Sequence, residues 1–444
     1  MKVVGIIAEY DPFHNGHLYQ IEYAKNELKA DAVVVVMSGD FTQRGEPALL
    51  DKYTRSKMAV YGGADLVIMM PVAYSTSSAE YFAGSGLGLL SSCGIVTDLL
   101  FGAESDDIER LSHAADILSD ESVEFKARLN SGLKKGLSFS KARADALPTE
   151  LSELISHPNN ILAIEYLKAI KKRDLGITPH ALKREGADYS GQVINDQYAS
   201  ASYIREQLKS GQTDLIKQID RYLPGKSYDI LAEAAVNNEL VYPDNCTRWF
   251  KYKTNYDFYK GNKFEEYADI SKDLAKRMDR SRPGNCSSIN QYIDSLKCKN
   301  YTRASISRAI CHYLLNITPA DRYDPAPYLR ILDFSKHGRS LMQEISTLAD
   351  IPMFCNVNDG LKMLSDKPEL LNMLKKDIYA ADIYSMYLFE KNGRTYPKEQ
   401  ERHFSPTDIY LQILIVKNSR GRGPTFPSKA SVACEEMVSR GFRG

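Results

Sequence analysis

The sequence predicts an α/β protein built on a doubly wound parallel sheet, with a helical insertion and a mainly helical C-terminal region. Short apolar runs alternate with amphipathic helical stretches from residue 1 to about 208. Strands and helices that alternate at this spacing form parallel sheets with helices on both faces. The pattern turns helical between about 106 and 173, and helical periodicity dominates again from about 209 onward.

Apolar runs mark the strands of this sheet in order. Each run after the first follows a helical stretch and is long enough for one buried strand. Ligands on parallel sheets bind outside the carboxyl ends of the strands, so we expect a site near Ser38-Gly39-Asp40, Pro71 and Gly102-Ala103-Glu104-Ser105. The predicted strands are Val3 to Ala8, Val33 to Met37, Leu66 to Met70, Thr97 to Phe101 and Ile177 to Leu182.

Breaker residues divide the chain into predicted units. We expect residues 1–208 to form the sheet domain, with the helical insertion at about 106–173. A mainly helical region follows at 209–418, where Pro-Gly pairs and Pro325 to Pro327 interrupt the helical periodicity. We expect residues 419–444, rich in Gly, Arg and Pro, to form a flexible tail.

The composition indicates a protein of the cytoplasm. The 444 residues are 43% hydrophobic, enough to bury one large core or roughly two to three smaller ones. No apolar run approaches the roughly 18 residues of a membrane span, and the N-terminus lacks the pattern of a signal peptide. The seven cysteines are scattered without a Cys-x-x-Cys pair, which indicates reduced thiols and argues against a zinc site.

The most informative motif is His14-Asn15-Gly16-His17, which follows the first strand and opens an amphipathic helix that runs through Leu28. The start of a helix presents unpaired backbone N–H groups and the positive end of the helix dipole. Gly16 lets a phosphate approach the backbone closely, and the two imidazoles complete the cradle. The motif therefore predicts a nucleotide phosphate site, with His14 and His17 as its catalytic residues.

A second motif, from Ser200 to Arg205, follows the fifth predicted strand. It reads Ser-Ala-Ser-Tyr-Ile-Arg and resembles the Ser-Ser-Thr-x-x-Arg-like turn of the adenylyl-transferring Rossmann-like folds, which also carry H-x-G-H. That resemblance implies that Ser200, Ser202 and Arg205 hold the leaving pyrophosphate. The alternative is an ordinary helix N-cap, since Ser-x-Ser often precedes a helical turn.

Charge is distributed unevenly, although 57 basic and 57 acidic residues cancel. Between Ser295 and Ala320 there is no acidic residue, and basic side chains alternate there with aromatic ones. This pattern fits either a solvated helix face or an RNA contact, in which cations neutralise phosphates and aromatic rings stack on bases. The candidate RNA-binding residues of this stretch are Lys297, Lys299, Arg303 and Arg308. Further basic clusters are Arg248, Lys251 and Lys253; Lys272, Lys276, Arg277, Arg280 and Arg282; and Lys168, Lys171, Lys172 and Arg173.

An ordered series of motifs resembles the bacterial tRNA(Met) cytidine acetate ligase family. The resemblance covers residues 1 to about 335 and is more specific than H-x-G-H alone. The blocks that carry it are Glu9-Tyr10-Asp11-Pro12-Phe13-His14-Asn15-Gly16-His17, Met37-Ser38-Gly39-Asp40-Phe41-Thr42-Gln43-Arg44-Gly45-Glu46-Pro47-Ala48, Phe101-Gly102-Ala103-Glu104, Pro158-Asn159-Asn160-Ile161-Leu162, Ala199-Ser200-Ala201-Ser202-Tyr203-Ile204-Arg205, and Lys299-Asn300-Tyr301-Thr302-Arg303 with Arg308 after it.

This resemblance implies a Rossmann-like nucleotidyltransferase fold and a ligase that works in two steps. Acetate and ATP, the latter with Mg²⁺, give acetyl-adenylate, and the acetyl group then passes to the wobble cytidine of elongator tRNA(Met) without acetyl-coenzyme A. Residues 1–208 are then the ATP-binding domain and 209–418 the tRNA-binding region. No protein metal site is expected. The ATP-site residues that the resemblance implies are Ile7, Ala8, Glu9, Tyr10, Asp11, Pro12, Phe13, His14, Asn15, Gly16, His17, Leu18, Tyr19, Gln20, Gly102, Asn159 and Arg184.

Several of these positions have plainer alternatives. Gly102 is equally consistent with a simple turn glycine, and Asn159 with an N-cap for the helix that starts near Ile161. Arg184 faces phosphates or pairs with the adjacent Glu185. Asp11 is expected to fix its turn more than to hold Mg²⁺.

Two basic residues after the Gly-Glu-Pro turn, Lys52 and Arg55, are also open to two interpretations. They can reach pyrophosphate or tRNA, but a solvated helix face is the stronger expectation.

Two other functions remain as alternatives. A small-molecule adenylyltransferase, of the pantetheine-phosphate or nicotinate-mononucleotide kind, uses the same cradle but needs little beyond the nucleotide domain. A non-catalytic RNA-binding protein would have no need of His14, Gly16, His17 and Arg205. The long helical half with its basic clusters favours a macromolecular acceptor.

Overall fold

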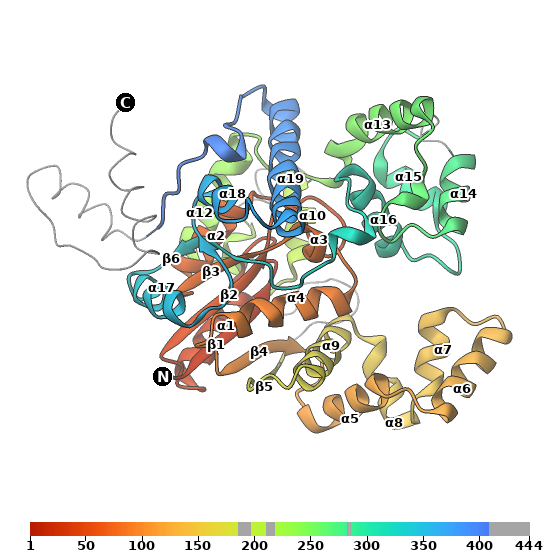
Figure 1. Cartoon of the computed structure of the whole chain (residues 1–444), viewed down its shortest axis with the longest axis horizontal. Helices are drawn as coiled ribbons and strands as arrows, with labels where there is room; N and C mark the ends of the chain where they lie inside the picture. Colours follow the sequence, from red (N-terminus) through yellow and green to blue (C-terminus); the bar gives the residue numbers. More distant parts are fainter. Residues whose placement is uncertain (185–196, 210–217, 282–283, 285, 408–444) are drawn as a thin grey trace, which may run out of the picture.

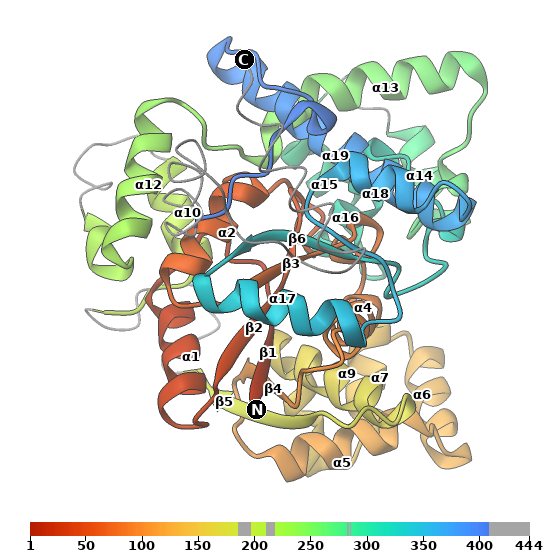
Figure 2. The same ribbon diagram turned by 60° about the vertical axis from the view of Figure 1, so that its left-hand side comes forward.

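The computed structural model describes residues 1–184, 197–209, 218–281, 284 and 286–407. At its centre is a seven-stranded sheet with the strand order β5-β4-β1-β2-β3-β6-β7 (Figures 1 and 2). The predicted flexible tail, residues 419–444, lies outside the described residues. The strands are β1 (Val3–Ala8), β2 (Ala32–Ser38), β3 (Leu66–Met70), β4 (Asp98–Ala103), β5 (Thr178–Lys183), β6 (Leu329–Phe334) and β7 (Met353–Phe354).

The first five strands are parallel and confirm the predicted sheet. β1 pairs with β2 in register from Val3 opposite Ala32, and its other edge pairs with β4 at Val4 and Gly5. The chain winds from β1 through β2 to β3 on one side, and β4 and β5 lie on the other side. The direction of winding therefore reverses between β1 and β4, and ligands of parallel sheets bind outside the strand ends at such a point.

Two strands of the C-terminal half were missed by the sequence analysis, which expected only helical periodicity there. β6 pairs antiparallel with β3, and the short β7 pairs parallel with β6. β6 contains Arg330 and Asp333, and both are buried. Because charged residues seldom occupy a buried strand unless they are paired, they obscure the apolar run that marks the other strands.

Helices cover both faces of the sheet, and this explains why the central strands β2 and β3 are almost continuously apolar. In β2, Val34 and Val36 belong to one core, while Val33 and Val35 belong to the core on the opposite face. The first core includes α4 (Ala79–Ser92), α5 (Ile108–Ser119), α9 (Pro158–Lys172) and α17 (Lys336–Leu348). The second includes α1 (Asn15–Asn26), α2 (Lys52–Tyr61), α10 (Ala201–Lys209) and α12 (Gly225–Val236).

Two helical groups extend from the sheet domain and lie on the same side of it in Figure 1. We call them the insertion lobe and the C-terminal lobe. The insertion lobe has α6 (Val123–Lys134), α7 (Phe139–Ala146) and α8 (Thr149–Ser152), and falls in the predicted insertion. The C-terminal lobe has α13 (Thr247–Lys260), α14 (Lys272–Arg280), α15 (Ile289–Leu296) and α16 (Arg303–Leu314).

The C-terminal lobe is anchored by a third hydrophobic core, which it shares with α3 (Val72–Ser75) and α19 (Pro368–Asn392). α18 (Val357–Met363) precedes α19 and packs against it. The two lobes approach each other where the ammonium of Lys299 lies 3.6 Å from the position that a Cβ on Gly136 would occupy. Among the described helices, none combines the length and hydropathy that a membrane span requires.

The expected solvated face of α2 is wrong, because Lys52 and Arg55 are both buried. The Lys52 ammonium lies 2.8 Å from a carboxylate oxygen of Asp40 and 3.1 Å from one of Glu399. Arg330 of β6 also pairs with Glu399. This buried cluster joins α2, the sheet and the C-terminal segment, and it accounts for the burial of Lys52, whereas Arg55 donates to backbone carbonyl oxygens.

The cluster gives a stability prediction. We expect Glu399→Gln to lower the free energy of unfolding by about 3 to 5 kcal/mol, because it leaves the buried Arg330 without its carboxylate partner and the buried Lys52 with Asp40 alone. Its two cationic partners hold the pKa of Glu399 below the ordinary value, although burial alone would raise it. The stabilisation is therefore present above pH of about 4.3 and is lost as the pH falls.

Urea denaturation at pH 7 and pH 3 measures this loss. Glu124→Gln is the matched control, since Glu124 pairs with Arg128 in an exposed helix pair that contributes about 0.3 to 0.5 kcal/mol. Equal effects of the two substitutions would contradict the assignment.

Candidate active site

The turn between β1 and α1 places the two motif histidines against each other. The His14 side chain caps α1, since its Nδ1 accepts a hydrogen bond from the Gly16 backbone N–H at 3.1 Å. The Nδ1 of His17 accepts one from the backbone N–H of His14 at 3.3 Å. The rings stack with their centroids 3.7 Å apart. The motif is thus a reciprocal capping box made of imidazoles.

These contacts define the state of both imidazoles. Because each Nδ1 accepts a backbone proton, each neutral ring carries its own proton on Nε2. Burial, reinforced by Arg184 and Arg205, lowers the pKa of His14 to about 3. Burial and the neighbouring His14 hold the pKa of His17 well below its ordinary value. At neutral pH the pair is uncharged and offers two Nε2–H donors to a ligand.

Gly16 is required by this packing. A Cβ at Gly16 would lie 3.0 Å from Cε1 and 3.1 Å from Nδ1 of the His14 ring. These distances are shorter than ordinary van der Waals contacts, so a side chain would displace the ring that caps the helix. The glycine has a role here besides the close approach of a phosphate that the sequence suggested.

The second motif lies against the first. The Arg205 guanidinium donates to the carbonyl oxygen of Asp11, its Nη1 lies 3.2 Å from the Asp11 carboxylate, and its Nη2 donates to Ser202 Oγ at 3.2 Å. Ser200 has a different place, because its Oγ accepts the Tyr203 N–H at 3.1 Å and so precedes α10 as a cap. The N-cap interpretation is therefore confirmed for Ser200, and the role of Ser202 and Arg205 toward pyrophosphate stays a prediction.

Asp11 fixes the turn, as expected. One carboxylate oxygen accepts the backbone N–H of Leu49 at 2.7 Å, and the other faces Arg205. The described residues contain no group of three or more metal-ligand side chains arranged to hold an ion.

Arg44 is a candidate site residue that was not predicted from the sequence. Arg44 follows β2 in the block Met37 to Ala48, and its Nη1 donates to Ser202 Oγ at 3.4 Å. Arg44 and Arg205 thus meet at one hydroxyl, an arrangement suited to a polyanion. The available signal was a cation in the loop that follows a parallel strand.

On the other side of the reversal point, polar groups connect β4, α9 and β5. Arg184 Nη1 donates to Asn159 Oδ1 at 3.1 Å, and Asn159 Nδ2 donates to Glu104 Oε1 at 2.6 Å. Arg184 also lies over Gly102, where an added Cβ would stand 3.3 Å from its Cγ. Gly102, Asn159 and Arg184 are therefore brought together, as the resemblance implied.

Glu104 is a second residue that the sequence analysis did not select, although it directly follows β4. It also accepts the backbone N–H of Asn160 at 2.9 Å. The alternative of Asn159 as an N-cap is wrong, because α9 already begins at Pro158. The proposed partner Glu185 lies outside the described residues.

The remaining motif positions hold the turn in place. Gln20 Nε2 donates to the Leu100 carbonyl oxygen at 3.0 Å, which ties α1 to β4. Asn15 Nδ2 donates to the carbonyl oxygens of Gln197 at 3.0 Å and Arg221 at 2.9 Å. Ile7 and Ala8 end β1, and Glu9, Tyr10, Pro12, Phe13, Leu18 and Tyr19 lie beside the histidines in sequence.

Three of the four candidate tRNA-binding residues lie near a carboxylate, although residues 295–320 contain no acidic side chain. Asp294, one residue before that stretch, lies 2.7 Å from Arg303 and 3.6 Å from Lys297. Asp269 lies 3.8 Å from Arg308. Nearby carboxylates reduce the local positive potential. This surface therefore carries both positive and negative charges.

Comparison with known proteins identifies the class. The model of the HIGH nucleotidyl transferase family matches residues 1–400. The fold and the H-x-G-H site thus define a HIGH-type nucleotidyl transferase.

Individual relatives and a solved structure show to which family within this class the chain belongs. A tRNA(Met) cytidine acetate ligase of Clostridium novyi is 34% identical over 407 residues, 88% of this chain and all of that protein. Another, from Caldanaerobacter subterraneus, is 36% identical and covers 87% of this chain and 95% of the relative. The crystal structure of Thermotoga maritima TmcAL bound with alpha-thio ATP has a TM-score of 0.82 and 29% identity, and covers 92% of this chain and 100% of that chain. The chain belongs to the tRNA(Met) cytidine acetate ligase family.

The neutral histidine pair can be tested directly. In protein labelled with ¹⁵N-histidine, we expect the ring signals of His14 and His17 to show the Nε2–H tautomer and not to titrate between pH 8 and 5.5, because burial opposes protonation. In urea the same rings should titrate near 6.5. The unfolded chain then binds more protons below pH 6.5, so the pair stabilises the fold less as the pH falls.

Single His→Asn variants assign the two signals. A ring that gains a proton near pH 6.5 in the folded protein would contradict the neutral pair.

Proposed function

We propose that this chain is an ATP-dependent ligase that forms N4-acetylcytidine at the wobble position of elongator tRNA(Met). In the first step acetate and ATP give acetyl-adenylate and pyrophosphate. In the second the acetyl group passes to the cytidine amine and AMP is released. The observation that carries the proposal is the convergence of the two motifs on one turn, in a chain whose relatives bear this activity in their names.

The first step needs positioning and charge stabilisation more than a covalent nucleophile. An acetate oxygen forms a bond to the α-phosphorus as the bond to the pyrophosphate oxygen breaks. The Nε2–H groups of His14 and His17 and the N-terminus of α1 stabilise the negative charge that develops. Arg205, Ser202 and Arg44 hold the pyrophosphate, and Gly102, Asn159 and Arg184 hold the nucleoside side of ATP.

The substrates supply the rest of the chemistry. ATP enters with Mg²⁺ carried on its phosphate oxygens, and acetyl-coenzyme A takes no part. In the second step the N4 amine of cytidine attacks the acetyl carbonyl, AMP leaves and the amine loses a proton. The C-terminal lobe holds the tRNA through Lys297, Lys299, Arg303 and Arg308. We place the protein in the cytoplasm, where its substrates are found.

The decisive experiment incubates the protein with tRNA(Met), ATP and ¹³C-labelled acetate. We expect mass spectrometry to find one labelled acetyl group on the wobble cytidine, together with AMP and pyrophosphate. Labelled acetyl-coenzyme A in place of acetate and ATP should give no product. Pyrophosphate exchange that responds to pantetheine phosphate or nicotinate mononucleotide, and not to acetate, would replace this proposal with a small-molecule adenylyltransferase.

The role of His17 predicts a specific pair of variants. His17→Asn keeps an acceptor near Nδ1 but removes the Nε2–H donor, so we expect acetate-dependent ATP–pyrophosphate exchange to fall about 10²- to 10³-fold, as for loss of an oxyanion donor. His17→Gln places an amide N–H near the position of Nε2 and should retain more activity. Circular dichroism checks that both variants fold. Near-normal exchange by His17→Asn would refute the assignment.

The basic residues of the C-terminal lobe predict that the two half-reactions separate. Neutralising Lys297, Lys299, Arg303 and Arg308 should weaken tRNA binding and acetyl transfer but leave pyrophosphate exchange unchanged. Added potassium chloride should act in the same direction, with a slope of about 0.7 to 0.9 per phosphate contact for tRNA and a smaller one for ATP. If both activities decline together, these cations belong to the ATP site or to the core.

A further inference from the structure

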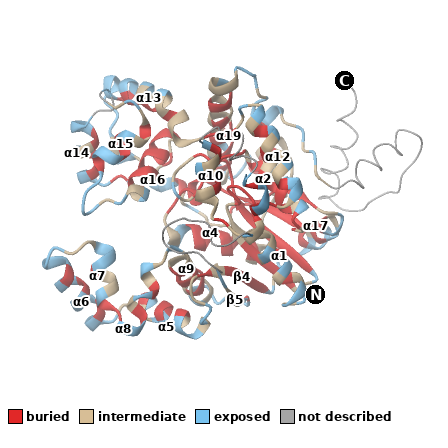
Figure 3. Ribbon diagram, turned by 180° about the vertical axis from the view of Figure 1, so that it is seen from behind, coloured by how far each residue is buried: buried red, intermediate tan, exposed pale blue. Residues whose placement is uncertain are grey.

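Helix α13 of the C-terminal lobe carries a row of exposed tyrosines. Tyr252, Tyr256 and Tyr259 are 65%, 50% and 88% exposed. Their spacing of four and three residues places them on one face of the helix. The outward side of α13 is accordingly coloured as exposed in Figure 3. Single exposed aromatic residues are common, but three in one row expose an apolar stripe that the fold itself does not use.

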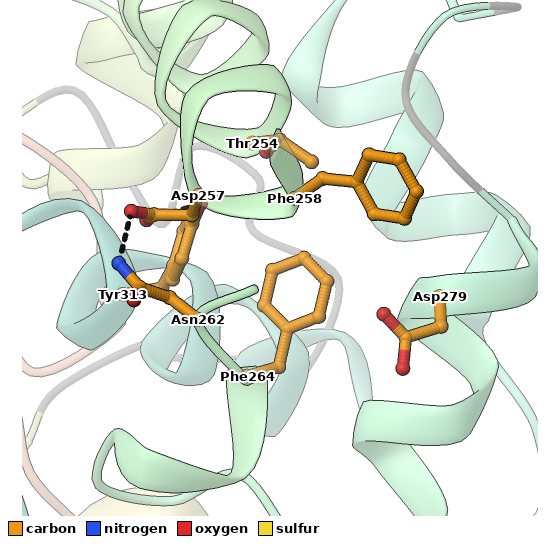
Figure 4. Close-up of a pocket in the computed structure, with 7 residues that line it drawn as sticks. All are labelled: Thr254, Asp257, Phe258, Asn262, Phe264, Asp279 and Tyr313. Carbon is orange, nitrogen blue, oxygen red and sulfur yellow. Dashed lines mark hydrogen bonds between the residues drawn. The ribbon is translucent and has the colours of Figure 1, made fainter. Parts of the chain in front are cut away.

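The inward side of the same helix accounts for its packing. Phe250, Thr254 and Asp257 are buried there, and Figure 4 shows the small pocket beside them, with Phe258 and Phe264 on its wall. The pocket measures about 20 Å³, room for about one water molecule and for no larger ligand. The tyrosine row is therefore available to a partner without disturbing the core.

The charge of α13 favours an anionic partner. The helix has four basic residues and a single acidic one, Asp257. That carboxylate is buried and accepts hydrogen bonds from Lys253 and from the Tyr313 hydroxyl, each at 2.8 Å. The exposed cations beside the row are Lys260, whose ammonium lies 5.9 Å from the Tyr256 ring centroid, and Arg248, which is 76% exposed and pairs with Glu390 at 3.2 Å.

The rings themselves are arranged for stacking. Tyr252 and Tyr256 lie nearly parallel, with an interplanar angle of 20° and centroids 6.3 Å apart. Unpaired RNA bases stack on aromatic side chains, and Lys or Arg beside the rings contacts the intervening phosphates.

We propose that this face of α13 binds the tRNA by stacking unpaired loop bases on Tyr252, Tyr256 and Tyr259, with Arg248 and Lys260 on the adjacent phosphates. The inference rests on the proposed function, because it assumes a tRNA substrate. A second copy of this chain is the less suitable occupant, since a symmetric contact would bring the same cations of α13 face to face.

Three variants and one probe test the proposal. The probe is an elongator tRNA(Met) transcript followed by fluorescence anisotropy. Tyr252→Ala/Tyr256→Ala should weaken its binding about tenfold or more, because one base stack contributes about 1 to 3 kcal/mol and 1.4 kcal/mol is tenfold. Tyr252→Phe/Tyr256→Phe keeps both rings and should bind as the wild type does. Tyr61→Ala, which removes a 42% exposed tyrosine of α2, is the matched control.

Acetate-dependent pyrophosphate exchange should be equal in all of these proteins, which shows that the ATP site is intact. Wild-type affinity in the double-alanine variant overturns the proposal, and so does equal loss in the double-phenylalanine variant, which would point to hydroxyl contacts. A dimer in sedimentation that the alanines dissociate, with unchanged tRNA affinity, assigns the face to self-association. A wild-type protein that neither binds nor acetylates tRNA refutes the proposed function itself.

Discussion

A single buried guanidinium, that of Arg55, holds together the strand ends on which the site is built. Arg55 is fully buried, and its nitrogens donate to the carbonyl oxygens of Glu9, Ser38, Gly39 and Leu50. A buried charge is costly unless its donors are satisfied. The loops that follow β1 and β2 must therefore keep the conformations that aim these carbonyl oxygens at Arg55.

The contacts of Arg55 position the candidate site through a series of hydrogen bonds between the loops. The Glu9 carbonyl oxygen is fixed by Arg55, and the Glu9 carboxylate accepts the backbone N–H of Gln43 at 2.6 Å, so the loop after β2 is tied to the loop after β1. Arg44, the next residue, then donates to Ser202 Oγ, which also accepts a hydrogen bond from Arg205. Burial raises the pKa of Glu9, while the hydrogen bond from Gln43 opposes that rise.

The features that the sequence predicts depend on residues that are close together in the chain. The strands were visible because both faces of a parallel sheet are apolar, and the histidine motif because its capping contacts join residues three positions apart. The features that the sequence did not predict depend on pairs of residues that are far apart in the chain. The buried Arg330 and Lys52 share the carboxylate of Glu399, which lies 69 and 347 residues away in the chain. Arg44 meets its hydroxyl across 158 residues. A periodic pattern of apolar residues cannot reveal contacts between residues this far apart in the sequence.

The separation of the two lobes from the sheet suits the proposed chemistry. An acyl-adenylate must be kept from water while a macromolecular acceptor is admitted, so the groups that make it and the groups that hold the acceptor cannot be the same. The proposed nucleotide site is instead formed by the neutral imidazoles of His14 and His17 and by short-range arginine contacts, and a low local dielectric strengthens such hydrogen bonds. The exposed cations and tyrosines lie on the C-terminal lobe, which shares a separate core with α3 and α19. Lys299 meets the insertion lobe at Gly136, so a tRNA held by the C-terminal lobe, as proposed, would also lie near the insertion lobe.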